Sequence, residues 1–552
     1  MKRFRKAILV LMTCLMTVAL ALGFVACGGS SYDDSLGGSS DSTQAQDTAK
    51  EIEVNTIVVD NLSESKEKDW FKFTIEGEGY VEIEFTHETV ASTKNHWCID
   101  FYTSDKTTGY GQKSGRTYWD VVGNENYTTP KMGIEAGTYY IEIQRSSSAW
   151  SDVNYDIKVN YTPTFDWETE LNNTYDKADE LSLGTMKKGT LVKSGDLDWY
   201  KFNVPANGYI TLDFTHEVVA STKNHWNAEL YTSDATTGYA INGSGQIYWD
   251  ITGNEDRSTD ELGVEAGTYY IKMLRNSSSW SDLQYGLKVN FTEASNWETE
   301  LNHTYDKADD MALNTPTYGT LAYSGDVDWY KIEIPANGYV TIDFKHEIVA
   351  STKNHWCMDF YMSDAVTGYG KDSGRNYWDV VGNQDKTTEY MGVSAGTYYI
   401  QVQRSSSAHE RVPYNVTVNF TEATDWETEN NNTYDKATLL ELDATIKGTL
   451  SSNSSQDWYK ITVPENGYVT IDFTHVMIES TKNHWCIDFF QADATTGVGK
   501  TSGRTYWDVK GNANFNSGNI QVSAGTYYIR IIRSSASWSP VQYDLTASFI
   551  SA

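Results

Sequence analysis

The sequence predicts an all-β protein made of four tandem antiparallel β-sandwich domains of jelly-roll-like type. Three observations lead to this prediction: a hexapeptide that occurs four times, short segments in which apolar and polar residues alternate, and turn sequences between those segments. The hexapeptide STKNHW begins at Ser92, Ser221, Ser351 and Ser480, so the period is 129 or 130 residues. A unit of this length buries roughly two thirds of the surface of its unfolded chain, which is enough for a core of its own.

The repeated segments have the residue pattern of half-buried strands. In residues 468–474, valine, isoleucine and phenylalanine alternate with tyrosine, threonine and aspartate, the period of two that a strand with one buried face requires. Residues 139–144 and 200–204 alternate in the same way. Turn sequences such as PANG, EAGT and SGD lie between the segments. Because no helical period is convincing, we expect antiparallel sheets packed face to face.

The chain is expected to begin with an export signal and a tether. Residues 1–26 carry four basic residues near the start and then an uncharged stretch from Ala7 to Ala26, the pattern of a secretory signal peptide. The sequence GFVAC, which ends at Cys27, resembles a bacterial lipobox and implies lipidation of Cys27 after cleavage before it. An uncleaved membrane anchor is the alternative. Residues 27–50 are rich in glycine, serine and aspartate, which is typical of a flexible tether.

The four repeats are predicted to occupy the rest of the chain. Their expected bounds are 51–162 with a truncated start, 163–293, 294–422 and 423–552. The chain has 43 basic and 75 acidic residues and a formal net charge of -32. This excess of acids argues against binding to nucleic acid and against docking on anionic lipid through a basic patch. Contact with a membrane is therefore expected only through the lipid anchor. Cys98, Cys357 and Cys486 hold equivalent positions in separate repeats and cannot pair within a domain.

The repeats resemble a known family. Repeats 2 to 4 open with WETELNNTYDKA, WETELNHTYDKA and WETENNNTYDKA, and each continues through GTL, an aspartate before Trp-Tyr-Lys, PxNGY and AGTYYI. This succession resembles the bacterial pre-peptidase C-terminal domain, including the collagen-binding module of clostridial collagenases. Repeat 1 departs from this succession. Residues 51–55 imitate the opening, but Asp69 follows Glu51 by 18 residues, whereas Asp198 follows Glu168 by 30. We therefore expect the first strand of repeat 1 to be missing.

Oxygen-bearing side chains recur at the opening of each full repeat. In repeat 2, Glu168, Glu170 and Asn172 alternate along an extended segment and can converge on one ion. Carboxylate and amide oxygens suit a hard cation, and calcium tolerates irregular geometry better than magnesium. The resemblance also implies calcium, bound by the E-x-E-x-N opening and by acids at the D-x-D turn. A solvated acidic linker with Asx turns is the alternative.

The resemblance assigns a ligand set to each full repeat. By position, the ligands would be Glu168, Glu170, Asn172, Asn173, Asp196 and Asp198 in repeat 2, Glu298, Glu300, Asn302, Asp326 and Asp328 in repeat 3, and Glu427, Glu429, Asn431, Asn432 and Asp457 in repeat 4. Repeat 3 has His303 at the fourth opening position, and repeat 4 has Ser455 in place of the first turn aspartate. Repeat 1 keeps only Asp69 and should bind weakly or not at all. Because the sites adjoin short interdomain links, the expected role of calcium is stability and rigidity.

Eight of the ten histidines fall at two repeated positions. The first set ends a strand, and the second set precedes a tryptophan: His87, His216, His346 and His475, and then His96, His225, His355 and His484. The HExxA sequences lack the second histidine of a zincin helix. A two-histidine transition-metal site would require the strand ends to meet. A hydrogen-bonded pair that closes a loop is the favoured alternative.

One face of the strand after STKNHW could recognise a ligand. Trp97, Ile99 and Phe101 share the apolar parity and are expected in the core. The opposite face combines acids, arginine and tyrosine, which suits sugar or peptide recognition, and a solvated sheet face is an equal alternative. The candidate ligand residues are Asp100, Tyr102, Arg116, Tyr118 and Asp120, then Asp359, Tyr361, Arg375, Tyr377 and Asp379, and finally Asp488, Arg504, Tyr506 and Asp508.

Four similar copies favour binding over catalysis. The chain contains no zincin or phosphate-loop motif, whereas tethered copies of one module raise effective concentration. The sequence therefore predicts a non-catalytic surface lipoprotein, a monomeric string of domains that binds extracellular glycan, glycoprotein or matrix protein. Collagen itself is disfavoured, because Gln144 and Ser146 lie where the collagenase module has aromatic residues. The alternatives are an accessory acting in trans with a secreted peptidase or glycosidase, an envelope spacer, and a glycosidase.

Overall fold

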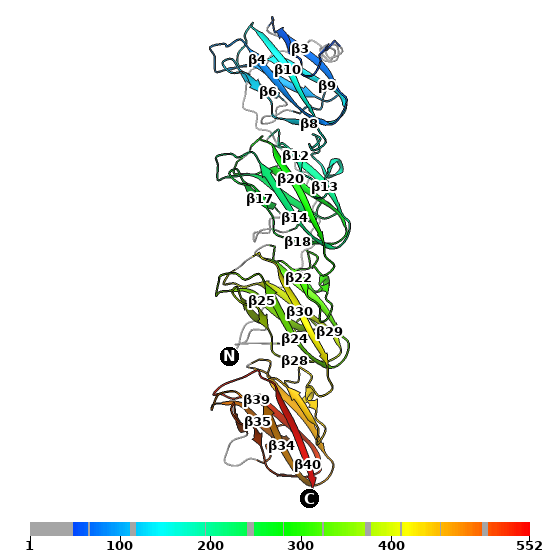
Figure 1. Cartoon of the computed structure of the whole chain (residues 1–552), viewed down its shortest axis with the longest axis vertical. Helices are drawn as coiled ribbons and strands as arrows, with labels where there is room; N and C mark the ends of the chain where they lie inside the picture. Colours follow the sequence, from blue (N-terminus) through cyan, green and yellow to red (C-terminus); the bar gives the residue numbers. More distant parts are fainter. Residues whose placement is uncertain are drawn as a thin grey trace, which may run out of the picture. The chain divides into compact units, whose positions relative to one another are not determined.

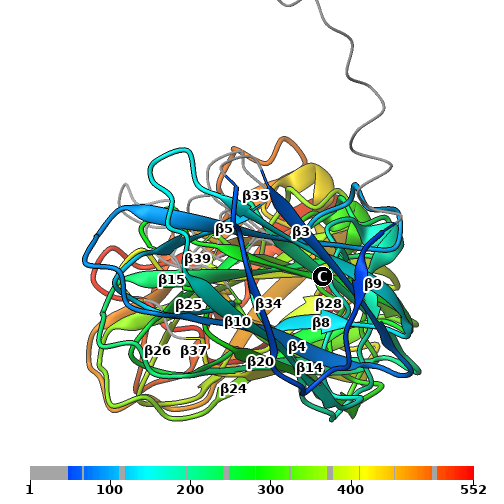
Figure 2. The ribbon, with the colours of Figure 1, turned by 90° about the horizontal axis from the view of Figure 1, so that it is seen from above.

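The computed structural model describes residues 48–64, 67–110, 118–193, 195–239, 248–279, 281–322, 325–369, 377–408, 411–452, 454–499 and 506–552. The predicted signal peptide, Cys27 and nearly all of the tether lie outside these residues. The described residues contain strands and three short 3-10 turns but no α-helix (Figure 2). Among them, no helix has the length and apolar character needed to cross a membrane. Residues 49–552 form one compact unit.

Four repeats of the same fold follow one another in sequence order (Figure 1). The strands of repeat 1 are β1 (Lys50–Glu51), β2 (Val58–Asn61), β3 (Lys68–Ile75), β4 (Gly79–His87), β5 (Asn95–Tyr102), β6 (Tyr118–Val122), β7 (Tyr127–Thr128), β8 (Met132–Ile134), β9 (Gly137–Arg145) and β10 (Asn154–Pro163). Those of repeat 2 are β11 (Asp179–Glu180), β12 (Lys187–Gly189), β13 (Leu197–Val204), β14 (Gly208–His216), β15 (Asn224–Tyr231), β16 (Tyr248–Thr252), β17 (Arg257–Ser258), β18 (Leu262–Val264), β19 (Gly267–Arg275) and β20 (Tyr285–Glu293).

Repeats 3 and 4 contain the equivalent strands. Those of repeat 3 are β21 (Asp309–Asp310), β22 (Thr317–Gly319), β23 (Val327–Ile334), β24 (Gly338–His346), β25 (Asn354–Met362), β26 (Tyr377–Val381), β27 (Lys386–Thr387), β28 (Met391–Val393), β29 (Gly396–Arg404) and β30 (Tyr414–Glu422). Those of repeat 4 are β31 (Thr438–Leu439), β32 (Thr445–Gly448), β33 (Gln456–Val463), β34 (Gly467–His475), β35 (Asn483–Gln491), β36 (Trp507–Lys510), β37 (Phe515–Asn516), β38 (Ile520–Val522), β39 (Gly525–Arg533) and β40 (Tyr543–Ser551). The 3-10 turns η1 (Tyr175–Lys177), η2 (Tyr305–Lys307) and η3 (Tyr434–Lys436) precede β11, β21 and β31.

Each repeat is a sandwich of two sheets. In repeat 2 one sheet has the order β11-β13-β19-β15-β16, and the other has the order β12-β20-β14-β17 with β18 also on β14. Among the described strands of repeat 2, only the edge strand β11 runs parallel to its neighbour, and the long strands pair antiparallel. Repeats 1, 3 and 4 share this topology. The predicted fold class, tandem antiparallel β-sandwiches, is confirmed.

The predicted loss of the first strand of repeat 1 is wrong. Strand β1 pairs parallel with β3 as β11 pairs with β13, and it sets Lys50 opposite Phe71 where Asp179 faces Tyr200. Glu51 therefore corresponds to Glu180 of β11, not to the opening glutamate of repeat 2. What the sequence of repeat 1 does not contain is a WETE opening segment before this strand.

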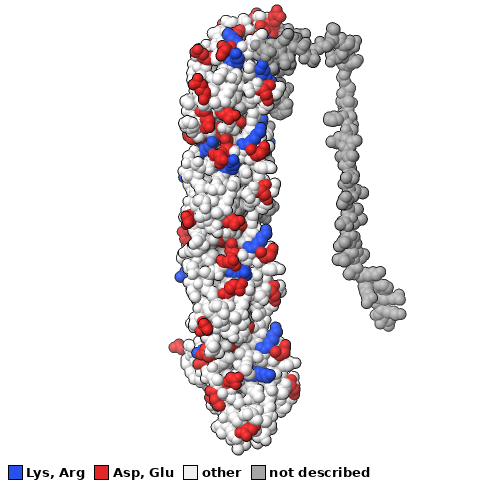
Figure 3. Space-filling model, turned by 90° about the vertical axis from the view of Figure 1, so that its right-hand side faces the viewer, with Lys and Arg blue, Asp and Glu red and all other residues white. Residues whose placement is uncertain are grey.

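Alternation along the strands fills the core between the sheets. Trp97, Ile99 and Phe101 are fully buried, as the period of two predicts, and the equivalent tryptophans Trp226, Trp356 and Trp485 are buried as well. Each repeat has its own cluster of buried apolar side chains. Outside the core, acidic side chains are spread over the face shown in Figure 3, with basic ones between them.

Candidate metal centre

The opening segment of each full repeat lies against the repeat before it. The ring of Trp167 packs on Tyr80 of repeat 1 at a centroid distance of 4.4 Å. The backbone N–H of Glu170 donates to the carbonyl of Gly133 at 3.2 Å. A Cβ at Gly133 would lie 1.9 Å from the carbonyl oxygen of Glu168, so this approach requires glycine. The contact thus fixes the opening segment from outside its own sandwich.

The same contact recurs at the next two junctions. Trp297 packs on Tyr209 at 4.3 Å, and Trp426 packs on Tyr339 at 4.5 Å. The apolar packing also crosses the first junction, because Val192 of repeat 2 belongs to the core cluster of repeat 1 and Leu171 packs against it. At the second junction, Ala322 of repeat 3 belongs to the core cluster of repeat 2. The opening segments are therefore held between two sandwiches.

Five of the predicted ligands in repeat 2 form a buried cluster of oxygen atoms. Glu168, Glu170, Asn172, Asp196 and Asp198 are between 0% and 6% exposed. One carboxylate oxygen from each of Glu170, Asp196 and Asp198 lies within 4.8 Å of the other two. Among the described residues, four buried oxygens of this cluster have no hydrogen-bond partner: Glu170 Oε1, Asn172 Oδ1, Asp196 Oδ1 and Asp198 Oδ1. Because buried acids are costly without a partner, this cluster could bind a metal ion.

Glu168 has a different role from its neighbours. Its Oε1 accepts from the backbone N–H of Thr190 at 2.7 Å, and its Oε2 accepts from the hydroxyl of Tyr200 at 2.9 Å. The hydroxyl of Tyr285 donates to Asp198 Oδ2 at 2.5 Å and leaves Oδ1 of that carboxylate unpartnered. Glu168 is thus fixed by protein donors and borders the oxygen cluster, while Glu170 and Asp198 each offer an unpartnered oxygen to it.

Asp179 is a part of the site that the sequence analysis missed. Its Oδ2 accepts from Nδ2 of Asn172 at 3.0 Å and from the backbone N–H of Thr169 at 2.8 Å. The amide nitrogen of Asn172 also donates to Glu168 Oε2 at 3.4 Å, and its Oδ1 has no hydrogen-bond partner among the described residues. The available signal was the aspartate that follows YDKA in repeats 2 and 3. In repeat 4, Thr438 takes this place and accepts from Asn431 at 3.3 Å.

Two predicted ligands face the backbone instead. Asn173 Oδ1 accepts from the N–H of Leu197 at 3.0 Å, and Asn432 Oδ1 accepts from the N–H of Gln456 at 2.8 Å. Both side chains therefore connect the opening segment to the strand that carries the turn aspartate. In this geometry they orient the cluster rather than add an oxygen to it.

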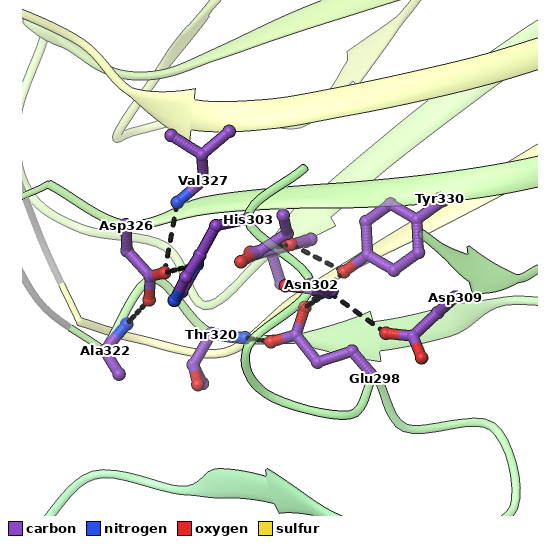
Figure 4. Close-up of polar contacts among 11 residues, drawn as sticks. Glu298, Asn302, His303, Asp309, Thr320, Ala322, Asp326, Val327 and Tyr330 are labelled. Atoms are coloured by element: carbon purple, nitrogen blue, oxygen red, sulfur yellow. Dashed lines mark hydrogen bonds and ion pairs between the residues drawn. The ribbon is translucent and has the colours of Figure 1, made fainter. Parts of the chain in front are cut away.

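Repeat 3 closes part of its cluster with a histidine. Nδ1 of His303 lies 3.2 Å from Asp326 Oδ1, and the N–H groups of Ala322 and Val327 donate to the same carboxylate at 2.7 and 3.0 Å (Figure 4). The hydrogen bond with Asp326 raises the pKa of His303 above its usual value. Glu300 Oε1, Asn302 Oδ1 and Asp328 Oδ1 remain without a hydrogen-bond partner among the described residues.

Repeat 4 brings three carboxylates together without the first turn aspartate. Glu427, Glu429 and Asp457 each place an oxygen within 4.8 Å of the other two. Ser455, at the position of Asp196, donates its hydroxyl to Asp457 Oδ1 at 3.4 Å. Glu429 Oε1 and Asn431 Oδ1 have no partner among the described residues. The cluster of repeat 4 is therefore built with one carboxylate fewer at the turn.

The acids of these clusters favour protonation when no cation is present. Burial raises the pKa of Glu168 to about 8 and that of Asp196 to about 6. Burial, and next the neighbouring Asp196, raises the pKa of Glu170 well above its usual range. In repeat 4, burial raises the pKa of Glu427 to about 7 and that of Glu429 to about 8. A proton or a cation must therefore balance each cluster.

The first set of histidines closes a loop. Nδ1 of His87 lies 2.9 Å from the carbonyl oxygen of Glu88, and Nε2 lies 3.1 Å from that of Val122. The ring also packs on Trp97 at a centroid distance of 4.3 Å. His96 is buried, and neither of its ring nitrogens has a partner among the described residues. The nitrogens of His87 thus contact backbone carbonyls rather than an ion shared with His96.

The candidate ligand face is more enclosed than expected. Asp100, Asp359 and Asp488 are buried, and their carboxylates accept hydrogen bonds from Gln144, Gln403 and Arg530 respectively. Tyr102 and Tyr361 are half-buried and stack on Trp70 and Trp329. Both faces of this strand are thus covered, so the three aspartates do not form the open polar surface that the sequence suggested.

The remaining candidates on this face are only partly described. Asp120, Asp379, Tyr506 and Asp508 are half-buried. The side chains of Tyr118 and Tyr377 lie outside the described part, as do the whole residues Arg116, Arg375 and Arg504. The thiols of Cys98, Cys357 and Cys486 are buried and lie beside the carboxylates of this face. Burial raises the pKa of Cys98 to about 12.

Comparisons with known proteins point to bacterial collagenases. No family model matches the chain. It is 24% identical over 245 residues to Collagenase ColA of Clostridium perfringens (strain 13 / Type A), covering 43% of this chain and 20% of that protein. It is 21% identical over 262 residues to Collagenase ColT of Clostridium tetani (strain Massachusetts / E88), covering 46% and 24%. The chain therefore matches less than a quarter of the length of either relative.

Two solved structures are also similar to parts of the chain. The pre-peptidase C-terminal domain of collagenase from Bacillus anthracis is 16% identical, with 20% of this chain and 94% of that one covered and a TM-score of 0.15. The tandem CBM51 modules of Sp3GH98 from Streptococcus pneumoniae SP3-BS71 are 10% identical, with 41% and 81% covered and a TM-score of 0.14. The predicted resemblance to clostridial collagenases is confirmed over 245 and 262 aligned residues.

Proposed function

We propose that this chain is a non-catalytic, exported lipoprotein, anchored at the bacterial surface through Cys27. Its four repeats bind extracellular polysaccharide, glycoprotein or matrix protein, and calcium stiffens the junctions between them. The observation that carries this proposal is the buried oxygen cluster at the start of repeats 2, 3 and 4, in which one oxygen each of Glu170, Glu300 and Glu429 has no hydrogen-bond partner within the described part of the chain.

Calcium suits the chemistry of the cluster. In repeat 2 the ion would be held by Glu170, Asn172, Asp196 and Asp198, all through oxygen, with Glu168 fixed beside them. Calcium accepts six to eight such oxygens in irregular geometry, whereas magnesium requires a near-ideal octahedron. The ion would supply positive charge where burial otherwise forces the carboxyls to keep their protons.

Stiffening follows from the place of the ligands. Glu170 contacts Gly133 of the preceding repeat through its backbone, and Leu171 beside it packs on that repeat's core. An ion that orders residues 168–172 therefore also orders the contact between two sandwiches. Four linked copies then present their ligand surfaces at a limited range of separations, which raises the effective concentration for a repetitive ligand.

Two measurements test this proposal on residues 28–552. Calorimetric titration with calcium should show three sites, lost in the triple variant E170Q/E300Q/E429Q and kept in the exposed control E217Q/E293Q/E422Q. An array of polysaccharides, glycoproteins and matrix proteins, probed with and without chelator, tests binding itself. No calcium uptake would overturn the calcium role. An array without selective binding would overturn the binding role and favour an envelope spacer.

A further inference from the structure

Each junction between repeats contains a cleft that neither repeat forms alone. The cleft between repeats 1 and 2 has a volume of about 480 Å³, and that between repeats 2 and 3 about 400 Å³, within the range of small-ligand sites. The two clefts are lined by aligned positions. In the first these include Thr103, Glu135 and Thr138 from repeat 1 and Thr169, Lys177 and Asp179 from repeat 2.

The lining is rich in hydrogen-bonding groups. Threonine hydroxyls, the carboxylates of Glu135 and Asp179, and the ammonium group of Lys177 face the first cleft. Carboxylates that accept from vicinal hydroxyls, with a lysine as donor, match the chemistry of a sugar chain. A peptide that binds by strand addition would need a free strand edge, and the edge strand at this cleft, β11, has only two residues.

The charge of the cleft narrows the class of sugar. Besides Glu170 and Glu300, whose charge a proton or the cation balances, Glu135 and Asp179 line the first cleft against one lysine, and Glu265 and Asp309 line the second against Lys307. An excess of carboxylates repels sulfated and uronic-acid polymers at close range. The cleft therefore suits a neutral or amino-sugar polysaccharide.

The metal cluster forms one wall of the cleft. Glu170 and Asn172 line the cleft, and both also belong to the oxygen cluster of repeat 2. Each is buried and keeps one oxygen without a partner among the described residues. Since the opening segment builds both features, whatever orders the cluster also shapes the cleft.

We propose that the junction clefts, rather than the outer sheet faces, bind the glycan, and that they take segments of neutral or amino-sugar polysaccharide. This inference rests on the proposed binding function and gives it a location. The chain then has three glycan sites, one fewer than its repeats. The third cleft, of about 570 Å³, keeps Lys436 but has Thr438 at the position of Asp179, so it should bind an amino sugar more weakly than the first two.

The test uses residues 28–552 in calcium with three probes: a chito-oligosaccharide, a neutral β-glucan oligosaccharide and heparin. Calorimetry should give up to three sites for at least one of the first two probes and none for heparin. The variant K177A/K307A/K436A, which leaves the carboxylate cluster intact, should weaken binding by at least about tenfold. The control K201A/K331A/K460A, on strand positions that do not line the clefts, should bind as the parent does.

Several results would overturn the cleft proposal. Four equivalent sites, or loss of binding in Y102A/Y361A instead of the lysine variant, would keep the binding function and move the site to the outer face. Binding only to a matrix protein on the array would exclude the clefts as glycan sites. If the chain bound no glycan and no matrix protein, both the proposed binding function and the proposed role of the clefts would be wrong.

Discussion

Repeat 1 and repeats 2 to 4 share one fold but not one site. Both kinds of repeat have the same two sheets with the same strand order. Only repeats 2 to 4 have the opening segment with its buried acids. The sandwich therefore folds without the oxygen cluster, and the cluster is an addition to the fold rather than a condition for it.

Repeat 1 has no counterpart of Glu168, and the residues that would surround such a glutamate differ as well. Gly189 of repeat 2 lies so close to Glu168 that a Cβ would be 2.6 Å from its Oε1, whereas repeat 1 has Asp60 at the paired position. Tyr200 donates to Glu168, whereas repeat 1 has Phe71. These residues are far apart in sequence and meet only around the glutamate, so the site behaves as one unit.

Calcium removal should separate the two kinds of repeat most strongly. A cation at about a hundredfold excess over its Kd contributes about 2.7 kcal/mol to a site, which corresponds to a Tm shift of roughly 10 °C for a domain of this size. In chelator, we expect faster amide exchange at residues 167–173, 297–303 and 426–432, with 50–61 unchanged. Hydrogen–deuterium exchange by mass spectrometry measures this, and equal loss in all four repeats would contradict it.

The second largest difference between repeat 1 and repeats 2 to 4 is expected in the pH dependence of stability without calcium. Burial raises the pKa of Glu168 and Glu298 to about 8, so the native state binds more protons than the unfolded state between about pH 4.5 and 8. Stability from these groups is present below about pH 4.5 and is lost as pH rises through 8. In repeat 1, burial raises the pKa of Asp69 only to about 6.

Calorimetry of the chelated protein at pH 5, 6.5 and 8 tests this difference. The transitions of repeats 2 to 4 should move to lower temperature across the whole range, while that of repeat 1 should change little above pH 6.5. Saturating calcium should reverse the trend for repeats 2 to 4, because deprotonated carboxylates bind the cation. A chelated protein that gains stability toward pH 8 would refute the assignment.

Filling the space at Gly189 should have an intermediate effect. The variant G189A forces its methyl group against Glu168 and the hydroxyl of Tyr285 and should destabilise repeat 2 by about 1–3 kcal/mol. The control G195A places its Cβ where no atom lies within 4 Å and should be close to neutral. In the double variant E168A/G189A the cost of the alanine should shrink, as the Asp60 of repeat 1 suggests. Equal costs in both backgrounds, measured by chemical denaturation, would show that Glu168 is not what excludes a side chain at this position.

The smallest effect is expected within the group of full repeats. Since His303 occupies an oxygen of Asp326, H303N should raise the calcium affinity of repeat 3 by up to about tenfold, or about 1.4 kcal/mol. The reciprocal variant N173H should lower that of repeat 2. Calcium titrations followed by amide exchange at 297–303 and 167–173 distinguish the two sites. Unchanged affinity in both variants would show that this position does not influence the ion.

Local pattern was enough to predict most of the cluster. Glu168, Glu170 and Asn172 alternate in one segment, so their parity placed them together, and the resemblance to the collagenase module added Asp196 and Asp198. The different roles of Glu168 and Glu170 could not be read from that parity, because Thr190 and Tyr200 decide them. The resemblance also assigned Asn173 as a ligand, although its Oδ1 accepts a hydrogen bond from the N–H of Leu197.

Three features of the chain follow from the sequence by itself: the number of repeats, the sandwich class and the oxygen-rich openings. Each can be recognised from the alternation of residues within a segment and from the spacing of identical motifs. Neither depends on how distant segments meet. The tertiary structure alone decided that β1 of repeat 1 matches β11, that both faces of β5 are covered, and that each opening segment joins two sandwiches. These depend on strand register and on contacts across a junction, such as Gly133 with Glu168, which bring together residues that no local pattern connects.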